Sequence, residues 1–151
     1  MHYFEDLHVG DQIGTASLTI TEAEIVAFAK LYDPQPFHLD AAAARSSLFG
    51  RLVASGWHTA ALSMRLLVQG ELKLAGGMIG LGVESIKWPQ PVLPGDTLHV
   101  VSEIIEMRPS GSKPDRGLVK IRSTTLNQRD EPVQVMTSTQ IVLRRPGATA
   151  T

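Results

Sequence analysis

The spacing of apolar residues changes along the chain, from a helical period in the first half to a strand-like alternation in the second. Between positions 22 and 33 the apolar residues recur three and four positions apart: Ile25, Phe28 and Ala29. This spacing predicts a helix with one buried face. Thr21 and Glu24 have the spacing of a capping box, so the helix is predicted to begin at Glu22. Because proline cannot continue a helix, it should end before Pro34.

A second helical stretch, residues 56–69, is apolar around almost its whole circumference. Its apolar positions are Trp57, Ala60, Ala61, Leu62, Met64, Leu66, Leu67 and Val68. A helix of this kind has to be enclosed by other elements, and its small residues allow a sheet to approach closely. No Asp or Glu occurs between Gly56 and Gln69. Between the two helices, Asp40 can cap a short helix over residues 41–44.

The second half of the chain alternates as β-strands do. Four long runs rich in Val, Ile and Thr, separated by Pro- and Gly-containing turns, cover residues 78–88, 97–108, 117–127 and 133–144. With a first strand over residues 12–20, five or more antiparallel strands would curve around the long central helix. This α+β pattern predicts the hot-dog fold. Residues 1–151 are expected to form one such domain, with a disordered tail at 146–151.

Composition narrows the classes of function. The chain has 151 residues, 43% of them hydrophobic, with a formal net charge of −1 and no cysteine. This is enough for one sizeable core and gives no electrostatic bias toward nucleic acid or a membrane surface. The absence of cysteine excludes disulfides and thiolate chemistry and suits a reducing compartment. The first residues do not form a secretory signal, so a cytoplasmic location is expected.

The chemistry-bearing stretch is Asp33-Pro34-Gln35-Pro36-Phe37-His38. Two prolines stiffen the backbone between Asp33 and His38, so the carboxylate and the imidazole can turn toward the same water molecule. We interpret them as an acid/base pair. A plain solvent-facing turn is the alternative, because Asp-Pro turns are common. The negative end of the preceding helix dipole is expected to raise the pKa of Asp33.

Gly56 lies at the predicted start of the central helix, where free backbone N–H groups favour a developing negative charge. A glycine there leaves room for a ligand. His58, two residues later, is expected to pack or to cap the helix. A metal site built from Asp33, His38 and His58 is only weakly indicated, because the chain lacks a short-range ligand pair such as His-x-x-x-His; no metal site is predicted.

Three segments together resemble one enzyme family. Residues 31–40, Ala54-Ser55-Gly56 and Pro91-Val92-Leu93-Pro94-Gly95-Asp96 are similar to the MaoC-like dehydratases, also called the (R)-specific enoyl-CoA hydratase family. The resemblance implies a hot-dog homodimer with an acyl-CoA tunnel and reversible addition of water to a trans-2-enoyl thioester. It implies that Asp33 and His38 are catalytic and that the Gly56 amide holds the thioester oxygen. The CoA thioester would be the substrate, and no further cofactor is expected.

The chain departs from typical members at two places. Gln35 stands where they have Asn, and alanines stand where they have a serine on the central helix. Segment 33–55 is expected to form a flap over the active site. The residues expected to bind the substrate are Gln35, Phe37, Leu39 and Ser55 of this segment and the neighbouring Trp57. The CoA phosphates could meet basic residues near predicted loops and strand ends: Arg45, Lys87, Arg108, Lys113 and Arg116.

Two other functions stay open from the sequence. A hot-dog thioesterase would use a carboxylate that commonly sits on the central helix, and residues 56–69 contain none. A non-catalytic module that binds acyl thioesters would keep the Asp33 and His38 motif only for the shape of its pocket. Release of free thiol, or tight binding without turnover, would separate these functions from hydration.

Overall fold

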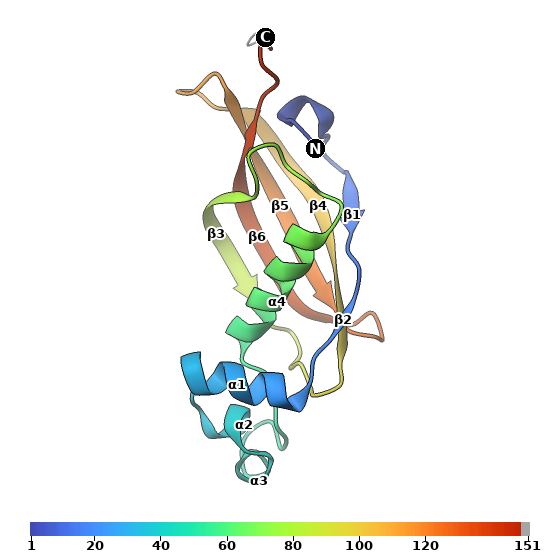
Figure 1. The fold of residues 1–151 in the computed structure, drawn as a ribbon, viewed down its shortest axis with the longest axis vertical. Helices are drawn as coiled ribbons and strands as arrows, with labels where there is room; N and C mark the ends of the chain where they lie inside the picture. The colour runs from blue at the N-terminus through green and yellow to red at the C-terminus, as the bar shows by residue number, and fades with distance from the viewer. Residues whose placement is uncertain (149–151) are drawn as a thin grey trace.

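A computed structural model describes residues 1–148 and shows one long helix lying against an antiparallel sheet (Figure 1). The helical elements in chain order are η1 (Phe4–Asp6), α1 (Glu22–Tyr32), α2 (Pro36–Leu39), α3 (Ala41–Ala44) and α4 (Gly56–Gln69). The strands are β1 (Gln12–Gly14), β2 (Leu18–Thr19), β3 (Ile79–Lys87), β4 (Thr97–Pro109), β5 (Arg116–Leu126) and β6 (Pro132–Leu143). The predicted disordered tail covers 146–151: residues 146–148 are described and form a turn, in which the Ala148 N–H donates to the Arg145 carbonyl at 3.0 Å, and 149–151 lie outside the described residues.

The sheet has six strands in the order β1-β4-β5-β6-β3, and β2 also pairs with β4. All of these pairs are antiparallel, as the short connections predict. The first strand, predicted as one run, is divided in two. Thr15 interrupts the ladder because its hydroxyl, rather than a backbone carbonyl, accepts a 2.9 Å hydrogen bond from the Val100 N–H.

Helix α4 has the predicted bounds, but the single chain encloses only one of its faces. The side chains that it buries are His58, Thr59, Ser63, Leu66 and Leu67. Ser63 meets the sheet through a 2.6 Å hydrogen bond to the Thr125 hydroxyl. On the opposite side Trp57, Met64 and Val68 are 60%, 42% and 50% exposed. None of the helices in residues 1–148 combines the length and the apolar character that crossing a membrane requires.

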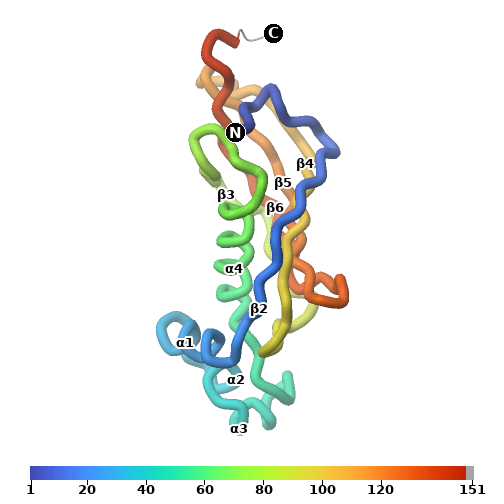
Figure 2. Tube along the Cα trace, turned by 45° about the vertical axis from the view of Figure 1, so that its right-hand side comes forward, coloured from blue at the N-terminus to red at the C-terminus, as the bar shows by residue number. Residues whose placement is uncertain are grey.

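The three helices α1, α2 and α3 lie together at one end of the molecule, beside the first turn of α4, and the β4–β5 hairpin lies at the other end (Figures 1 and 2). Helix α1 begins at Glu22 with the predicted capping box between Thr21 and Glu24. Helix α2 was not expected, because Pro34 and Pro36 indicated a loop. Pro36 occupies its first turn, where the missing N–H is not needed.

Strand β3 forms one edge of the sheet and packs little of its surface within the chain. Ile79, Leu81 and Val83 are 46%, 58% and 54% exposed. Its backbone pairs with β6 on one side only. An unpaired edge that carries apolar side chains is a surface that proteins normally cover.

Candidate active site

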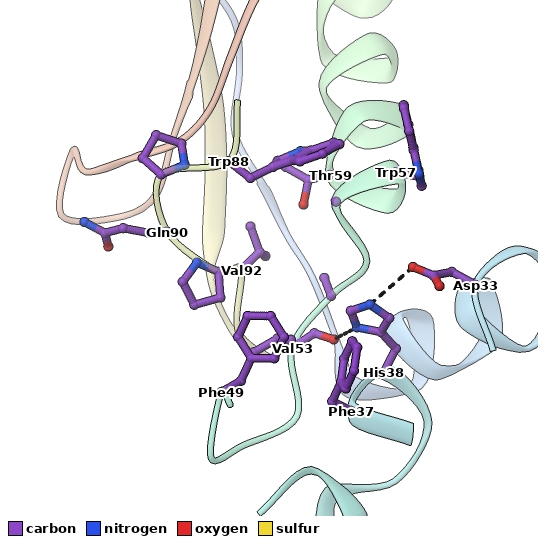
Figure 3. A pocket seen from close by; sticks show the side chains of 14 residues that line it. Asp33, Phe37, His38, Phe49, Val53, Trp57, Thr59, Trp88, Gln90 and Val92 are labelled. Carbon is purple, nitrogen blue, oxygen red and sulfur yellow. Dashed lines mark hydrogen bonds and ion pairs between the residues drawn. The ribbon is translucent and has the colours of Figure 1, made fainter. Parts of the chain in front are cut away.

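A cavity of about 430 Å³ opens where the helical end of the molecule meets the first turn of α4. Three segments form its wall: the flap between Asp33 and Ala54, the beginning of α4, and residues 88–92 that follow β3. Figure 3 shows their side chains around the cavity. The site therefore depends on the fold, which brings a loop, a helix end and a strand end together.

Asp33 and His38 face each other at the edge of this cavity. The Nε2 atom of His38 lies 3.2 Å from Oδ2 of Asp33, and the two side chains are 7% and 16% exposed. On its other side the imidazole Nδ1 lies 2.6 Å from the carbonyl oxygen of Val53. A carbonyl oxygen only accepts hydrogen bonds, so Nδ1 carries a proton and donates it to Val53. Nε2 is therefore the nitrogen that can take up or release a proton toward Asp33.

The backbone of the flap holds this pair in place. Asp33 ends α1 with φ −152° and ψ 67°, which turns the chain out of the helix. The N–H of His38 donates to the carbonyl of Gln35 at 2.9 Å, and the N–H of Val53 donates to the carbonyl of Phe37 at 3.1 Å. Together with the Nδ1 bond, the last contact joins the two ends of the flap through adjacent residues.

The carboxylate of Asp33 has more hydrogen-bond donors than the sequence indicated. Burial raises the pKa of Asp33, but the Ser55 hydroxyl, the Gln35 amide and His38 together lower it below its ordinary value. The Gln35 bond, from Nε2 to Oδ1, is 2.6 Å long. The expected upward shift is therefore wrong, because side-chain donors outweigh both burial and the helix end. Asp33 is ionised at neutral pH and can accept a proton.

Gly56 begins α4, and Ser55 caps it by accepting a hydrogen bond from the Trp57 N–H. Within residues 1–148, no hydrogen bond uses the Gly56 N–H. Trp88 fills the space that a side chain at position 56 would take, while Gly56 itself lines the cavity. A Cβ atom built there would lie 2.6 to 2.9 Å from the indole ring of Trp88.

Trp88 forms the wall of the cavity next to Gly56, and two contacts fix its ring. Its Nε1–H donates to Oε1 of the buried Gln134 at 3.1 Å. Its ring also meets Trp57 edge-on, with the centroids 5.3 Å apart. Sequence reasoning did not identify Trp88, because the residue reaches the site only through the pairing of β3 with β6.

The predicted substrate-binding residues take three different positions. Phe37 and Trp57 line the cavity. Gln35 and Ser55 contact the Asp33 carboxylate and are not part of the lining. Leu39 ends α2, is partly buried, and also lies outside the lining. Sequence reasoning missed Thr59, whose only signal was its position one turn after Gly56.

His58 packs, as expected, on the α1 side of α4. Its ring stacks on Phe28 with the centroids 4.5 Å apart and an angle of 2° between the planes. Burial lowers the pKa of His58 below its ordinary value. It lines a different hollow from the one that contains Asp33 and His38. In the described part of the chain, no cluster of three or more His, Cys, Asp or Glu side chains has the arrangement of a metal site.

The basic residues suggested for the CoA phosphates are divided between the two ends of the folded molecule. Arg108, Lys113 and Arg116 lie in or beside the β4–β5 hairpin, far from the cavity of the same chain (Figure 1). Arg116 is also paired with Asp115 at 2.8 Å. Arg45 follows α3 in the flap, and Lys87 directly precedes Trp88. These last two are near the cavity in sequence and fold.

Comparison with known proteins finds the same family that the sequence motifs resemble. Residues 6–126 match the MaoC-like domain family. A MaoC-like dehydratase from Rhodospirillum rubrum has 53% identity and a TM-score of 0.93, and the match covers 97% of this chain and 99% of that one. The 3-hydroxyacyl-thioester dehydratase Z of Mycobacterium tuberculosis is 32% identical over 110 residues, which are 68% of this chain and 70% of the relative.

The fold itself is supported by a more distant structure. A Mycobacterium tuberculosis protein described as having a double hot-dog fold gives a TM-score of 0.80 at 16% identity, covering 99% of this chain and 46% of that one. This confirms the predicted hot-dog fold. With its sheet, its central helix and a family match over residues 6–126, the chain belongs to the MaoC-like domain family.

Proposed function

We propose that the protein is a hydratase and dehydratase of acyl thioesters, which adds water reversibly to a trans-2-enoyl thioester to give a 3-hydroxyacyl thioester. The observation that carries the proposal is the pairing of Asp33 with Nε2 of His38, 3.2 Å apart, beside a cavity with a mainly apolar wall. The similarity to a 3-hydroxyacyl-thioester dehydratase supports it.

The pairing of the two side chains assigns each of them a role. Asp33 is ionised because its donors lower its pKa, so it takes a proton from the water whose oxygen bonds to C3. Nε2 of His38 gives a proton to C2. Asp33 then passes its new proton to His38, which restores the starting state. The free N–H of Gly56 stabilises the negative charge that develops on the thioester oxygen.

In this proposal the acyl group is carried by coenzyme A, and the reaction needs no other cofactor. We place the protein in the cytoplasm. The cavity accepts the acyl group, and of the basic residues suggested from the sequence, Arg45 and Lys87 lie at this end of one chain and can meet the carrier phosphates. A chain without cysteine is compatible with a reducing compartment. The formal net charge of −1 provides no attraction to nucleic acid or to an anionic membrane.

A second copy of the chain completes the enzyme in this proposal. The exposed edge β3 and the exposed face of α4 both carry apolar side chains, including Leu81 and Met64. Pairing of β3 with β3 of a second copy would satisfy the free edge and cover this surface. Trp57, which lines the cavity but is 60% exposed, would then be shielded.

The direct test is hydration of crotonyl-CoA, followed by the loss of enoyl absorbance in the ultraviolet. Asp33→Asn keeps the shape of the side chain but cannot accept a proton, so the rate should fall by about 10²- to 10⁴-fold. Asp130→Asn is the matched control, because Asp130 is an exposed carboxylate on a turn with φ 56°, a conformation that Asn also adopts. Equal rates for the wild type and Asp33→Asn would remove the proposed role of Asp33.

The same assay separates the alternative functions. A thioesterase would release free CoA thiol, which a thiol reagent detects. A binding module would bind crotonyl-CoA without consuming it. The absence of Asp and Glu from α4 gives a thioesterase no carboxylate at its usual position.

A further inference from the structure

Thr59 places a hydroxyl group without a protein partner in the wall of the cavity. The residue is 2% exposed and lines the cavity one helical turn after Gly56. Its side-chain oxygen makes no hydrogen bond with any described residue, and Figure 3 shows it directed into the cavity. Ser63, one turn further along α4, differs, because its hydroxyl bonds to the Thr59 carbonyl at 2.8 Å and to the Thr125 hydroxyl at 2.6 Å.

The wall around the Thr59 hydroxyl is otherwise apolar. The neighbouring lining side chains are Phe37, Phe49, Val53, Trp88 and Val92. The Gln90 side chain, which also lines the cavity, is engaged by the Glu131 carboxylate. Among the described residues, no lysine or arginine belongs to the lining. Apart from Asp33 and His38, Thr59 therefore offers the substrate an uncommitted polar side chain.

We propose that Thr59 determines specificity by binding an uncharged oxygen substituent on the acyl group, so that the preferred substrates are short enoyl thioesters with a hydroxyl on C4. This inference rests on the proposed function, because it concerns the acyl group of that reaction. A purely hydrocarbon chain would remove water from the Thr59 hydroxyl and return no hydrogen bond. A hydroxyl on the substrate restores the bond that the cavity otherwise lacks.

The position of the substituent follows from the helix. Gly56 and Thr59 are three residues apart, just under one turn, which is about 4.5 Å along the axis. Both line the cavity, so in this proposal the acyl chain of a thioester whose oxygen is held by the Gly56 N–H runs along this turn, with the carbon atoms beyond C3 beside the Thr59 hydroxyl. A carboxylate at this position is disfavoured, because no described lysine or arginine belongs to the lining and Asp33 is ionised.

The test compares 4-hydroxybut-2-enoyl-CoA with pent-2-enoyl-CoA, two substrates that differ by a hydroxyl in place of a methyl group. The wild type should have a higher kcat/KM for the hydroxylated substrate. Thr59→Val has the same shape without the hydroxyl, and it should lower this preference by about tenfold to a hundredfold. Thr59→Ser keeps the hydroxyl and should keep the preference. A merely structural role of Thr59 would lower both rates together and leave their ratio unchanged.

Failure of this inference and failure of the proposed function give different results. If pent-2-enoyl-CoA is hydrated but Thr59→Val has the same substrate preference as the wild type, the specificity role is overturned and the function stands. If neither substrate is hydrated, the proposed function falls. Calorimetric binding of 4-hydroxybutanoyl-CoA and pentanoyl-CoA then tests Thr59 alone. Tighter binding of the hydroxylated compound, lost in Thr59→Val, supports the inference, and equal binding overturns it.

Discussion

Replacing Gly56 by alanine tests how tightly the cavity wall is packed. The new Cβ would lie 2.6 Å from Cε2 of Trp88, whereas carbon atoms in contact are about 3.5–4.0 Å apart. The indole ring would have to move by roughly 1 Å. It is rigid and is held by Gln134 and Trp57, so it cannot yield as a flexible side chain would.

The size and the sign of the effect follow from this contact. Overpacking in a well-packed region costs about 1–3 kcal/mol. Without the clash, glycine to alanine within a helix stabilises by about 0.5–1 kcal/mol. We therefore expect Gly56→Ala to lower the free energy of unfolding rather than raise it. For a chain of this length each kcal/mol corresponds to about 2–4 °C in Tm.

The measurement is thermal unfolding followed by circular dichroism, at one fixed protein concentration. Gly14→Ala is the control, because a Cβ at Gly14 would meet no atom within 4 Å. In a Trp88→Ala background the ring is absent, so Gly56→Ala should no longer destabilise the protein there. The reasoning is refuted if Gly56→Ala is as stable as the wild type, or if its cost is the same with and without Trp88.

Two further predictions concern the acid/base pair and the sheet edge. Gln35→Leu removes the 2.6 Å hydrogen bond to Asp33, so the pKa of Asp33 should rise and the acid-side fall of kcat/KM should move to higher pH; an unchanged pH profile would contradict the role of Gln35. Leu81→Lys places a charge on the apolar edge of β3, where Leu81 is 58% exposed. Light scattering should show a dimer for the wild type and a smaller species for this variant. Val9→Lys, at a residue that is 62% exposed outside the sheet, should leave the mass unchanged.

Local patterns predicted the elements well, because their causes lie within a few residues. The capping box at Thr21 marked the start of α1, and the apolar run between Gly56 and Gln69 marked α4. Helix α2 was missed, because prolines that stop one helix can also begin the next. The division of the first strand was missed as well, because it depends on the Thr15 hydroxyl and a backbone N–H 85 positions away.

The site was only partly predictable, since its remaining features depend on contacts between distant segments. The spacing of Asp33 and His38 indicated the pair that the structure brings together. The direction of the Asp33 pKa shift did not follow from the sequence, because the Ser55 hydroxyl comes from the cap of another helix. Trp88 and Thr59 reach the cavity from a strand end and from one face of α4. Trp88 carries no local signal of that position, and the only signal for Thr59 is its place about one turn after Gly56.

The joined ends of the flap have a consequence for how the sequence of this chain can vary. The Val53 N–H donates to the Phe37 carbonyl, and the Val53 carbonyl accepts a hydrogen bond from Nδ1 of His38. These two hydrogen bonds hold the two ends of the loop together. Insertions, deletions and substitutions between residues 40 and 51 can reshape the entrance to the cavity, while Asp33 and His38 stay where they are. Selection for new substrates can therefore act on one stretch of chain without disturbing the chemistry.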